Sequence, residues 1–214
     1  MTGKFNLNIE FMKYRALSLV IILWFVTCSI FLFMNMPFIY TSVVHVLNVQ
    51  HDIKMSSRQI SDNYLLIIRY LQSFFISDMQ TTLPINNVVR IHFRDVRGLI
   101  LLNNLFMVVM TPIVIKILII LKKNHFLWLL KSALRQIYGS SVFLFVFALI
   151  DFNDAFIFFH KILFRNNDWI FNAKKEPIII LFPDQYFMIG FVFVFIFVTV
   201  FYLILFRFIN RSTQ

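Results

Sequence analysis

Residues 187–206 read FMIGFVFVFIFVTVFYLILF and contain no charged side chain. A helix needs about 20 such residues to cross the ~30 Å apolar core of a bilayer, so this run can span a membrane. Uncharged runs also occupy 16–34, 98–115 and 136–150. The first two come close to that length, whereas the third is short, and we expect its helix to begin before Gln136. The pattern predicts an all-α membrane protein with four transmembrane helices.

The composition indicates that lipid covers part of the protein surface. Hydrophobic residues make up 60% of the 214 residues and charged residues only 14%, whereas soluble domains average about 45–50% and about 25%. The run at 16–34 is longer than a signal-peptide core and no small-x-small cleavage site follows it, so we interpret it as a permanent helix. Cys28 is the only cysteine, which excludes a disulfide framework within the chain. Phe25 and Val26 precede it in place of the small residues of a lipidation site, so we expect a packed thiol.

The net charge of +10 is unevenly distributed. If both termini lie in the cytoplasm, the inner pieces 1–15, 116–135 and 207–214 hold ten bases and one acid, Glu10, which gives +9. The other ten bases and nine acids fall in two external segments and give +1. This is the positive-inside pattern. Basic flanks beside anionic headgroups explain the charge without a nucleic-acid partner.

The runs and the charges together predict the order of segments in a multi-pass membrane protein. The predicted segments are a cytoplasmic N-terminus 1–15, a first transmembrane helix 16–40, an extracellular segment 41–97, a second helix 98–121, a cytoplasmic loop 122–135, a third helix 136–150, an extracellular segment 151–186, a fourth helix 187–206 and a cytoplasmic C-terminus 207–214.

The two extracellular segments are too long for simple connectors and are expected to form a small α+β cap. Residues 63–71 have a helical apolar pattern, and we expect a helix on the membrane surface with Tyr64 and Tyr70 at headgroup depth. Residues 81–91 resemble a turn followed by a short strand. The apolar run at 176–183 is bounded by prolines and is interpreted either as a buried strand or as an interface loop.

Two histidine motifs lie in these extracellular segments. His92 and Asp95 are three residues apart and share a helix face, where the carboxylate can fix the tautomer of the imidazole. His160 lies among aromatic residues, and such surroundings keep a histidine neutral and able to act as a base. A lone interfacial histidine is more often a hydrogen-bonded surface residue, and that alternative stays open for each motif. It is our interpretation of His45, His51 and His125.

Cofactor motifs are missing from the sequence. We find no nucleotide-binding glycine loop, no dinucleotide fingerprint and no nucleophile elbow. Two histidines and a carboxylate can hold iron or zinc, but no His-x-x-x-His spacing occurs and no third ligand stands out. We therefore expect no cofactor, no metal and no nucleotide partner.

Short motifs follow one another along the extracellular segments. They are Tyr64 with Tyr70 and Leu71; His92, Asp95, Val96 and Arg97; Asp151 with Phe152; Phe159, His160, Asn167 and Trp169; and Leu181, Phe182, Pro183 and Asp184. In this order and spacing the sequence resembles the lipoprotein intramolecular transacylases of Gram-positive bacteria, which are four-helix membrane proteins. The resemblance covers nearly the whole chain. One departure is the stretch 172–175, where a proline-and-acid turn is expected.

The resemblance implies an activity and a site at the outer leaflet of the bacterial cell membrane. Such an enzyme moves the sn-2 acyl chain of a diacylglyceryl-modified lipoprotein to the α-amine of its N-terminal cysteine and leaves a lyso-form lipoprotein. The implied partners are these lipoproteins and membrane lipids. The resemblance implies that His92 and His160 are essential. The supporting residues are Asp95, Arg97, Asp151, Asn167 and Trp169.

Histidine chemistry suits this transfer. Ester-to-amide transfer is downhill, and a neutral histidine can take the amine proton and return it to the leaving glyceryl oxygen. We favour His160 as the base and His92, oriented by Asp95, as the group that stabilises the oxyanion, with the reverse assignment open.

Two alternative functions remain: a non-enzymatic pore or assembly protein, and a lipid acyltransferase that acts between molecules. The uncharged helices 16–34 and 187–206 argue against a pore.

Overall fold

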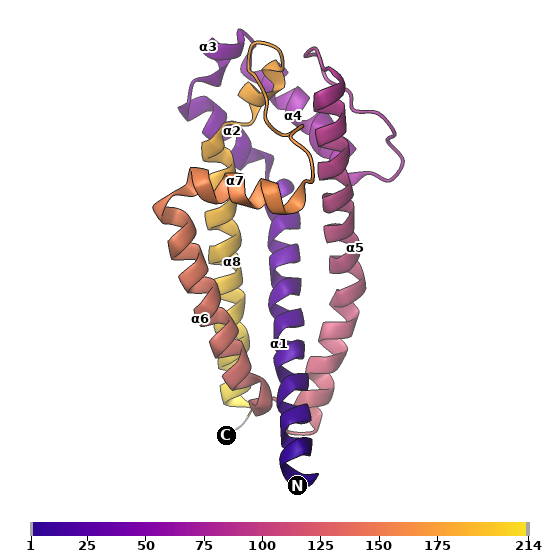
Figure 1. Ribbon diagram of the computed structural model, residues 1–214, viewed down its shortest axis with the longest axis vertical. Helices are drawn as coiled ribbons and strands as arrows, with labels where there is room; N and C mark the ends of the chain where they lie inside the picture. Colours follow the sequence, from indigo (N-terminus) through magenta and orange to yellow (C-terminus); the bar gives the residue numbers. More distant parts are fainter. Residues whose placement is uncertain (1, 213–214) are drawn as a thin grey trace. The chain divides into compact units, whose positions relative to one another are not determined.

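The structure is a computed structural model that describes residues 2–212, with side chains from Met12 to Ser212. Four helices are long and apolar enough to cross a membrane, as the sequence predicts (Figure 1). They are α1 (Thr2–Met34), α5 (Asn87–Lys123), α6 (Trp128–Ile150) and α8 (Asp184–Arg211). The shorter elements are α2 (Pro37–Val46), α3 (Val49–Ile53), α4 (Ser57–Gln72), α7 (Phe152–Leu163) and the 3-10 helix η1 (Pro177–Leu181). The protein is a multi-pass, all-helical membrane protein.

The β part of the predicted cap is wrong, because no strand occurs in residues 2–212. The apolar run at 176–183 forms η1 instead, with Pro177 at its first position, where the missing N–H costs no hydrogen bond. The predicted strand within 81–91 is also absent. The Thr82 N–H donates to the side chain of Asn63 rather than to a neighbouring strand, and α5 begins at Asn87.

Helix boundaries differ from those of the predicted segments, most clearly in the first and third helices. The first predicted helix extends to residue 40, but α1 ends at Met34 and Pro37 begins α2, since a proline disfavours a helical conformation of the residue before it. As expected, the third helix begins before Gln136; α6 starts at Trp128. Lys131 lies in this early part, with its Nζ 5.5 Å from the ring centroid of Phe206, so a basic residue is accommodated beside an aromatic ring.

The chain forms two compact units. The bundle unit consists of Met1–Ser29, Phe106–Ile150 and Phe193–Gln214, and the site unit consists of Ile30–Leu105 and Asp151–Val192. In the bundle unit, Trp24 Nε1 donates to Thr111 Oγ1 at 2.9 Å, and Tyr138 stacks on Tyr202 with ring centroids 4.0 Å apart. Only 11% of the apolar windows of α5 and α6 is buried within the protein, so lipid must cover the rest. Cys28 is a free, partly buried thiol in α1, as expected.

Aromatic packing organises the site unit, in which α7 runs crosswise to the first turns of α8 (Figure 1). Tyr40 of α2 stacks on Tyr64 of α4 at 3.8 Å between centroids, and the Tyr64 hydroxyl bonds to the Tyr186 hydroxyl at 2.9 Å. Tyr64 is 0% exposed and Tyr70 4%. The helix predicted at 63–71 is confirmed within α4. Protein side chains cover its two tyrosines, and their expected location at headgroup depth stays a prediction.

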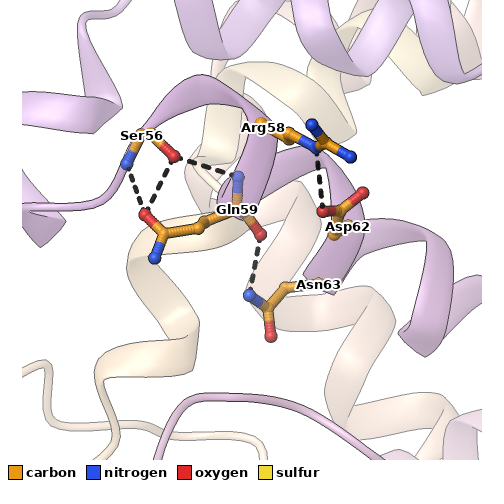
Figure 2. A network of polar contacts seen from close by, with 5 residues as sticks. All are labelled: Ser56, Arg58, Gln59, Asp62 and Asn63. Carbon is orange, nitrogen blue, oxygen red and sulfur yellow. Dashed lines mark hydrogen bonds and ion pairs between the residues drawn. The ribbon is translucent and has the colours of Figure 1, made fainter.

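The start of α4 is fixed by its own side chains (Figure 2). Ser56 Oγ accepts from the Gln59 N–H, and Gln59 Oε1 accepts from the Ser56 N–H, which is a complete capping box. One turn on, Asn63 is 0% exposed and its Nδ2 donates to the Gln59 carbonyl at 2.8 Å. Asn63 Oδ1 also accepts from the hydroxyl of Thr81 and the N–H of Thr82. The irregular segment before α5 is thereby attached to a capped helix.

Candidate active site

The site unit brings the two histidine motifs together. His92 lies in the second turn of α5 and His160 in the last turn of α7. Their ring centroids are 6.2 Å apart with an angle of 30° between the ring planes. Two residues far apart in the sequence therefore face one small volume, and a single substrate headgroup can contact both.

Aromatic rings form the walls around this pair. The ring of Phe164 lies 5.0 Å and that of Phe171 5.3 Å from the His92 ring, centroid to centroid. The Trp169 indole lies 5.0 Å from the His160 ring. Aromatic surroundings lower the local dielectric, so hydrogen bonds made to a reacting group there are stronger than in water.

The tautomer of His160 follows from its hydrogen bond. Nδ1 lies 2.8 Å from the Phe156 carbonyl oxygen, one turn earlier in α7. A carbonyl oxygen only accepts, so Nδ1 carries the proton and Nε2 presents its lone pair. Burial lowers the pKa of His160 below its ordinary value of 6.5, although the bond to the Phe156 carbonyl opposes this change. His160 therefore presents a neutral base at Nε2.

His92 has the opposite arrangement. It is 9% exposed, and its buried Nδ1 has no hydrogen-bond partner among the described residues. A buried N–H without an acceptor costs more than a bare lone pair, because the desolvation of the donor is uncompensated. The favoured neutral tautomer thus carries its proton on Nε2. His92 is suited to donate a hydrogen bond to an oxygen.

Asp95 is attached to a different partner from the one expected. Its Oδ2 accepts from Asn166 Nδ2 at 3.1 Å, while the Nδ1 of His92 accepts no donor and donates to no acceptor. No hydrogen bond from Asp95 to His92 Nδ1 therefore occurs among the described residues, and the orientation of His92 by Asp95 stays a prediction. Asp95 instead joins α5 to the loop after α7.

Asn166 is the site residue that the sequence motifs missed. Its Oδ1 accepts from the Asp168 N–H at 3.2 Å, and its carbonyl accepts from Trp169 Nε1 at 3.1 Å. The predicted neighbour, Asn167, contributes its carbonyl to the Ile170 N–H. Asn166 itself is the sequence signal, since an asparagine side chain commonly accepts from the backbone N–H two residues later in an Asx turn. Asn166 thus sets the position of the loop that carries Trp169 beside His160.

The other predicted residues have structural partners. Arg97 donates from Nε and Nη2 to the Ser73 carbonyl, at 3.2 and 2.7 Å, and its guanidinium lies 5.0 Å from the Tyr70 ring centroid. Asp151 caps α7, with Oδ1 accepting from the Asp154 N–H at 3.0 Å. The structure therefore gathers both histidines and Trp169, with Asp95 reached through Asn166, whereas Arg97 and Asp151 hold the surrounding elements.

A buried carboxylate, which the sequence motifs did not indicate, follows the stretch 172–175 and bonds back to its first residue. Glu176 is 7% exposed. Its Oε1 accepts from Asn86 Nδ2 at 2.6 Å and its Oε2 from the Asn172 N–H at 2.8 Å. Both oxygens are satisfied, so this acid fixes the loop after Phe171 to the residue before α5. In the part of the chain from Met12 to Ser212, no three His, Cys, Asp or Glu side chains form a metal-binding cluster.

The fold and the site together define a class: a multi-pass membrane protein with two neighbouring histidines surrounded by aromatic side chains. The family model described as lipoprotein intramolecular transacylase Lit matches residues 15–187. The chain belongs to this family, and it is a membrane acyltransferase that transfers an acyl group within a lipoprotein. The resemblance stated from the sequence motifs is confirmed.

Solved structures show the same fold. The membrane-integral lipoprotein intramolecular transacylase Lit from Bacillus cereus is 23% identical with a TM-score of 0.81, and the match covers 96% of this chain and 97% of that one. A variant of it with a histidine replaced by alanine gives 22% identity and a TM-score of 0.80, over 99% and 97% of the two chains. A histidine-to-arginine variant gives 26% and 0.71, over 99% and 100%. Among curated protein sequences no match is found.

Proposed function

We propose that this enzyme moves the sn-2 acyl chain of a diacylglyceryl-modified lipoprotein to the α-amine of the N-terminal cysteine, which leaves a lyso-form lipoprotein. The observation that supports this reaction is the pair of histidine rings with centroids 6.2 Å apart, one presenting a base and the other a donor. Base and donor are what an amine attacking an ester requires. No nucleotide enters the reaction, because an amide forms at the expense of an ester.

The proposed steps balance in protons and bonds. His160 Nε2 takes a proton from the α-amine as nitrogen attacks the ester carbonyl carbon. His92 Nε2–H donates to the carbonyl oxygen as negative charge develops there. The bond from carbon to the glyceryl oxygen then breaks, and His160 returns its proton to that oxygen. Attack closes an eight-membered ring through the thioether, so holding the headgroup folded is a large part of catalysis.

Supporting roles follow from the contacts. Trp169 is proposed to hold the His160 ring, and Asp95 to hold Asn166 and hence the loop of Trp169. Arg97 and Asp151 are proposed to support the site by securing Ser73 and the start of α7. The surrounding membrane lipids are proposed partners of the exposed apolar side chains. Nucleic acid and metal ions have no proposed role.

The function is tested by mass spectrometry of lipoprotein N-termini from cells with and without the protein. Cells that produce it are expected to contain cysteine with an N-acyl chain and one remaining O-acyl chain. Chelators are expected to leave the rate of the purified enzyme unchanged. Diacylglyceryl lipoprotein with a free amine in both strains would contradict the proposal, and a rate lost to chelators and restored by a metal would contradict metal-free chemistry.

Both termini are expected to face the cytoplasm, with the active site at the outer leaflet, because the predicted inner pieces carry ten bases and one acid, or +9. A tag at Gln214 should be protected from protease added to intact cells. A cysteine introduced at exposed Arg58 should react with an impermeant reagent, and Cys28 should not. Cleavage of the tag from outside would reverse the topology and exclude an outer-leaflet site.

The pH profile is expected to report the lowered pKa of His160. The substrate amine, with a pKa of about 7.7–8.0, gives the logarithm of the rate a slope of one below that range. A base with the ordinary histidine pKa of about 6.5 would steepen the slope toward two just below pH 6.5. Because burial lowers the pKa of His160, its basic form persists to lower pH, and the second break should appear only there. Single-turnover rates measure both slopes, and a break at pH 6.5 would contradict this assignment.

Replacing Asn166 by alanine is expected to lower the transfer rate about tenfold to a hundredfold. The change removes a hydrogen bond to a carboxylate, worth about 1.5–3 kcal/mol, and releases the loop that holds Trp169 against His160. Asn167→Ala is the matched control and should keep nearly full activity, since only its carbonyl makes a described hydrogen bond. Rates with a purified diacylglyceryl lipopeptide distinguish the two. Equal losses in both variants would remove the specific role of Asn166.

A further inference from the structure

A groove of about 700 Å³ lies in the site unit, away from the histidine pair. It is formed by the end of α1, the start of α2, the last turns of α4 and the segment that follows α4. Its walls are mainly apolar, with Leu65, Ile68 and Phe75 among them, and its polar groups include Arg69 and Gln72. Neither His92 nor His160 lines it, so the proposed acyl transfer does not use this volume.

The chain itself places the groove at the membrane interface. Met34, one of the lining residues, is the last residue of the membrane-span candidate Met12–Met34. A residue at the end of a span lies near the lipid headgroups. Phe74 is 66% exposed and Phe75 97%. Adjacent aromatic side chains left uncovered at this depth are typical of contact with lipid rather than with water.

The electrostatics of the groove favour an anion. The guanidinium of Arg69 is exposed and has neither a hydrogen-bond nor an ion-pair partner among the described residues. By contrast, Arg90 pairs with Asp78 at 2.6 Å. No aspartate or glutamate lines the groove. An unpaired arginine beside apolar walls matches a phosphate attached to an acyl chain, because guanidinium binds phosphate oxygens in bidentate geometry.

At the polar end, two amides are already paired with each other. Asn35 Nδ2 donates to Gln72 Oε1 at 3.0 Å, and Gln72 Nε2 donates to Asn35 Oδ1 at 3.4 Å. This pair joins the residue after α1 to the last residue of α4. It holds Arg69, one turn earlier in α4, at the mouth of a preformed groove rather than on a loose segment.

We propose that this groove binds an anionic glycerophospholipid of the surrounding membrane, with its phosphodiester on Arg69 and an acyl chain along Leu65, Ile68 and Phe75. The lipoprotein substrate is the less suitable occupant, since its diacylglyceryl group carries no phosphate for Arg69. A zwitterionic lipid is also less suitable, because no acid in the lining receives its ammonium group. The site is independent of the proposed acyl transfer.

Native mass spectrometry of the full-length purified protein tests the assignment. The probes are phosphatidylglycerol, phosphatidylcholine and diacylglycerol with identical acyl chains. The wild type should retain phosphatidylglycerol in preference to both others, and Arg69→Gln should weaken that binding about tenfold or more, the loss expected for one charge-assisted hydrogen-bonded pair. Arg69→Lys should retain part of it, since a point charge still binds phosphate.

The matched control is Arg58→Gln, on the same helix. The side chain of Arg58 is 92% exposed and its Nε lies 3.9 Å from Asp62 (Figure 2), so its loss should leave lipid binding unchanged. Leu65→Trp fills the groove without removing a charge and should also displace phosphatidylglycerol. Because lipid retention is measured and acyl transfer is not, the result stands apart from the proposed function.

Three results would overturn the assignment. Equal phosphatidylglycerol retention by the wild type and Arg69→Gln would show that Arg69 does not bind the phosphate. Equal retention of diacylglycerol and phosphatidylglycerol would show that no phosphate is recognised. Displacement of phosphatidylglycerol from the wild type by a diacylglyceryl lipopeptide would assign the groove to the substrate.

Discussion

Alanine at position 160 is expected to lower the rate of acyl transfer by about 10²–10⁴-fold, the usual contribution of a positioned acid–base group. The variant loses the Nε2 lone pair that we propose takes the amine proton, while the rest of α7 keeps its cap at Asp151. The measurement is N-acylation of a purified diacylglyceryl lipopeptide, with insertion of the variant checked in the membrane fraction. Full activity in this variant would remove His160 from the mechanism.

His92→Ala is expected to cost about 10²–10³-fold, as the loss of an oxyanion donor commonly does. The two roles are separated by glutamine, whose amide can donate a hydrogen bond but cannot accept a proton at neutral pH. We therefore expect His92→Gln to recover part of the lost rate and His160→Gln to recover none. The reverse result would assign the base to His92.

The remaining histidines supply the controls. Alanine at His45 or His51 in the site unit, or at His125 in the bundle unit, should change the transition-state free energy by no more than about 0.5 kcal/mol, as exposed substitutions usually do. All three residues are exposed, and the side chain of His51 is 84% exposed. A large loss at any of them would extend the site beyond the pair described above.

The helices of the fold could be predicted from the sequence because the bilayer imposes a length. An uncharged run such as 187–206 has few alternatives to a spanning helix. The cap lacked such a constraint. A short apolar run such as 176–183 fits a buried strand or a helix equally well by pattern. Pro177 is compatible with the start of either, and the structure has the 3-10 helix η1. The burial of Tyr64 was not predictable for a similar reason, since its neighbours come from α2 and α8.

Only those features of the site that depend on residues close together in the sequence could be predicted. His160 among aromatics, and the neutral base this indicates, can be inferred from nearby residues. The partner of Asp95 is 71 residues away in the sequence, and no local spacing identifies it. The three-residue separation puts Asp95 and His92 on one helix face, which suggested that Asp95 orients His92. In the structure Asp95 accepts a hydrogen bond from Asn166 in the loop after α7. The choice between Asn166 and Asn167 depended on that tertiary contact.

Transfer is expected to stay within one substrate molecule, as the family description states for its members. No serine elbow occurs in the sequence, and Cys28 lies within α1. Neither feature supplies a side chain to carry the acyl group covalently. Amine and ester must then meet directly, and the thioether already holds them together. Well-oriented attack of this kind reaches an effective concentration of about 10⁵ M or more. A second lipid arriving by diffusion cannot compete with that.

The decisive experiment mixes the purified enzyme with two diacylglyceryl lipopeptides of different sequence, one of them carrying isotopically heavy acyl chains. Each product should keep N-acyl chains of its own isotope only, at every enzyme concentration, because the acyl group never leaves its own headgroup. A third lipopeptide without an sn-2 ester should remain unacylated in the same mixture. If heavy chains reach the light peptide, or the third peptide gains an N-acyl chain, the ester and the amine come from different molecules. The two histidines would then have to serve a donor lipid bound beside the substrate, and the ring-closing attack proposed for this site would be excluded.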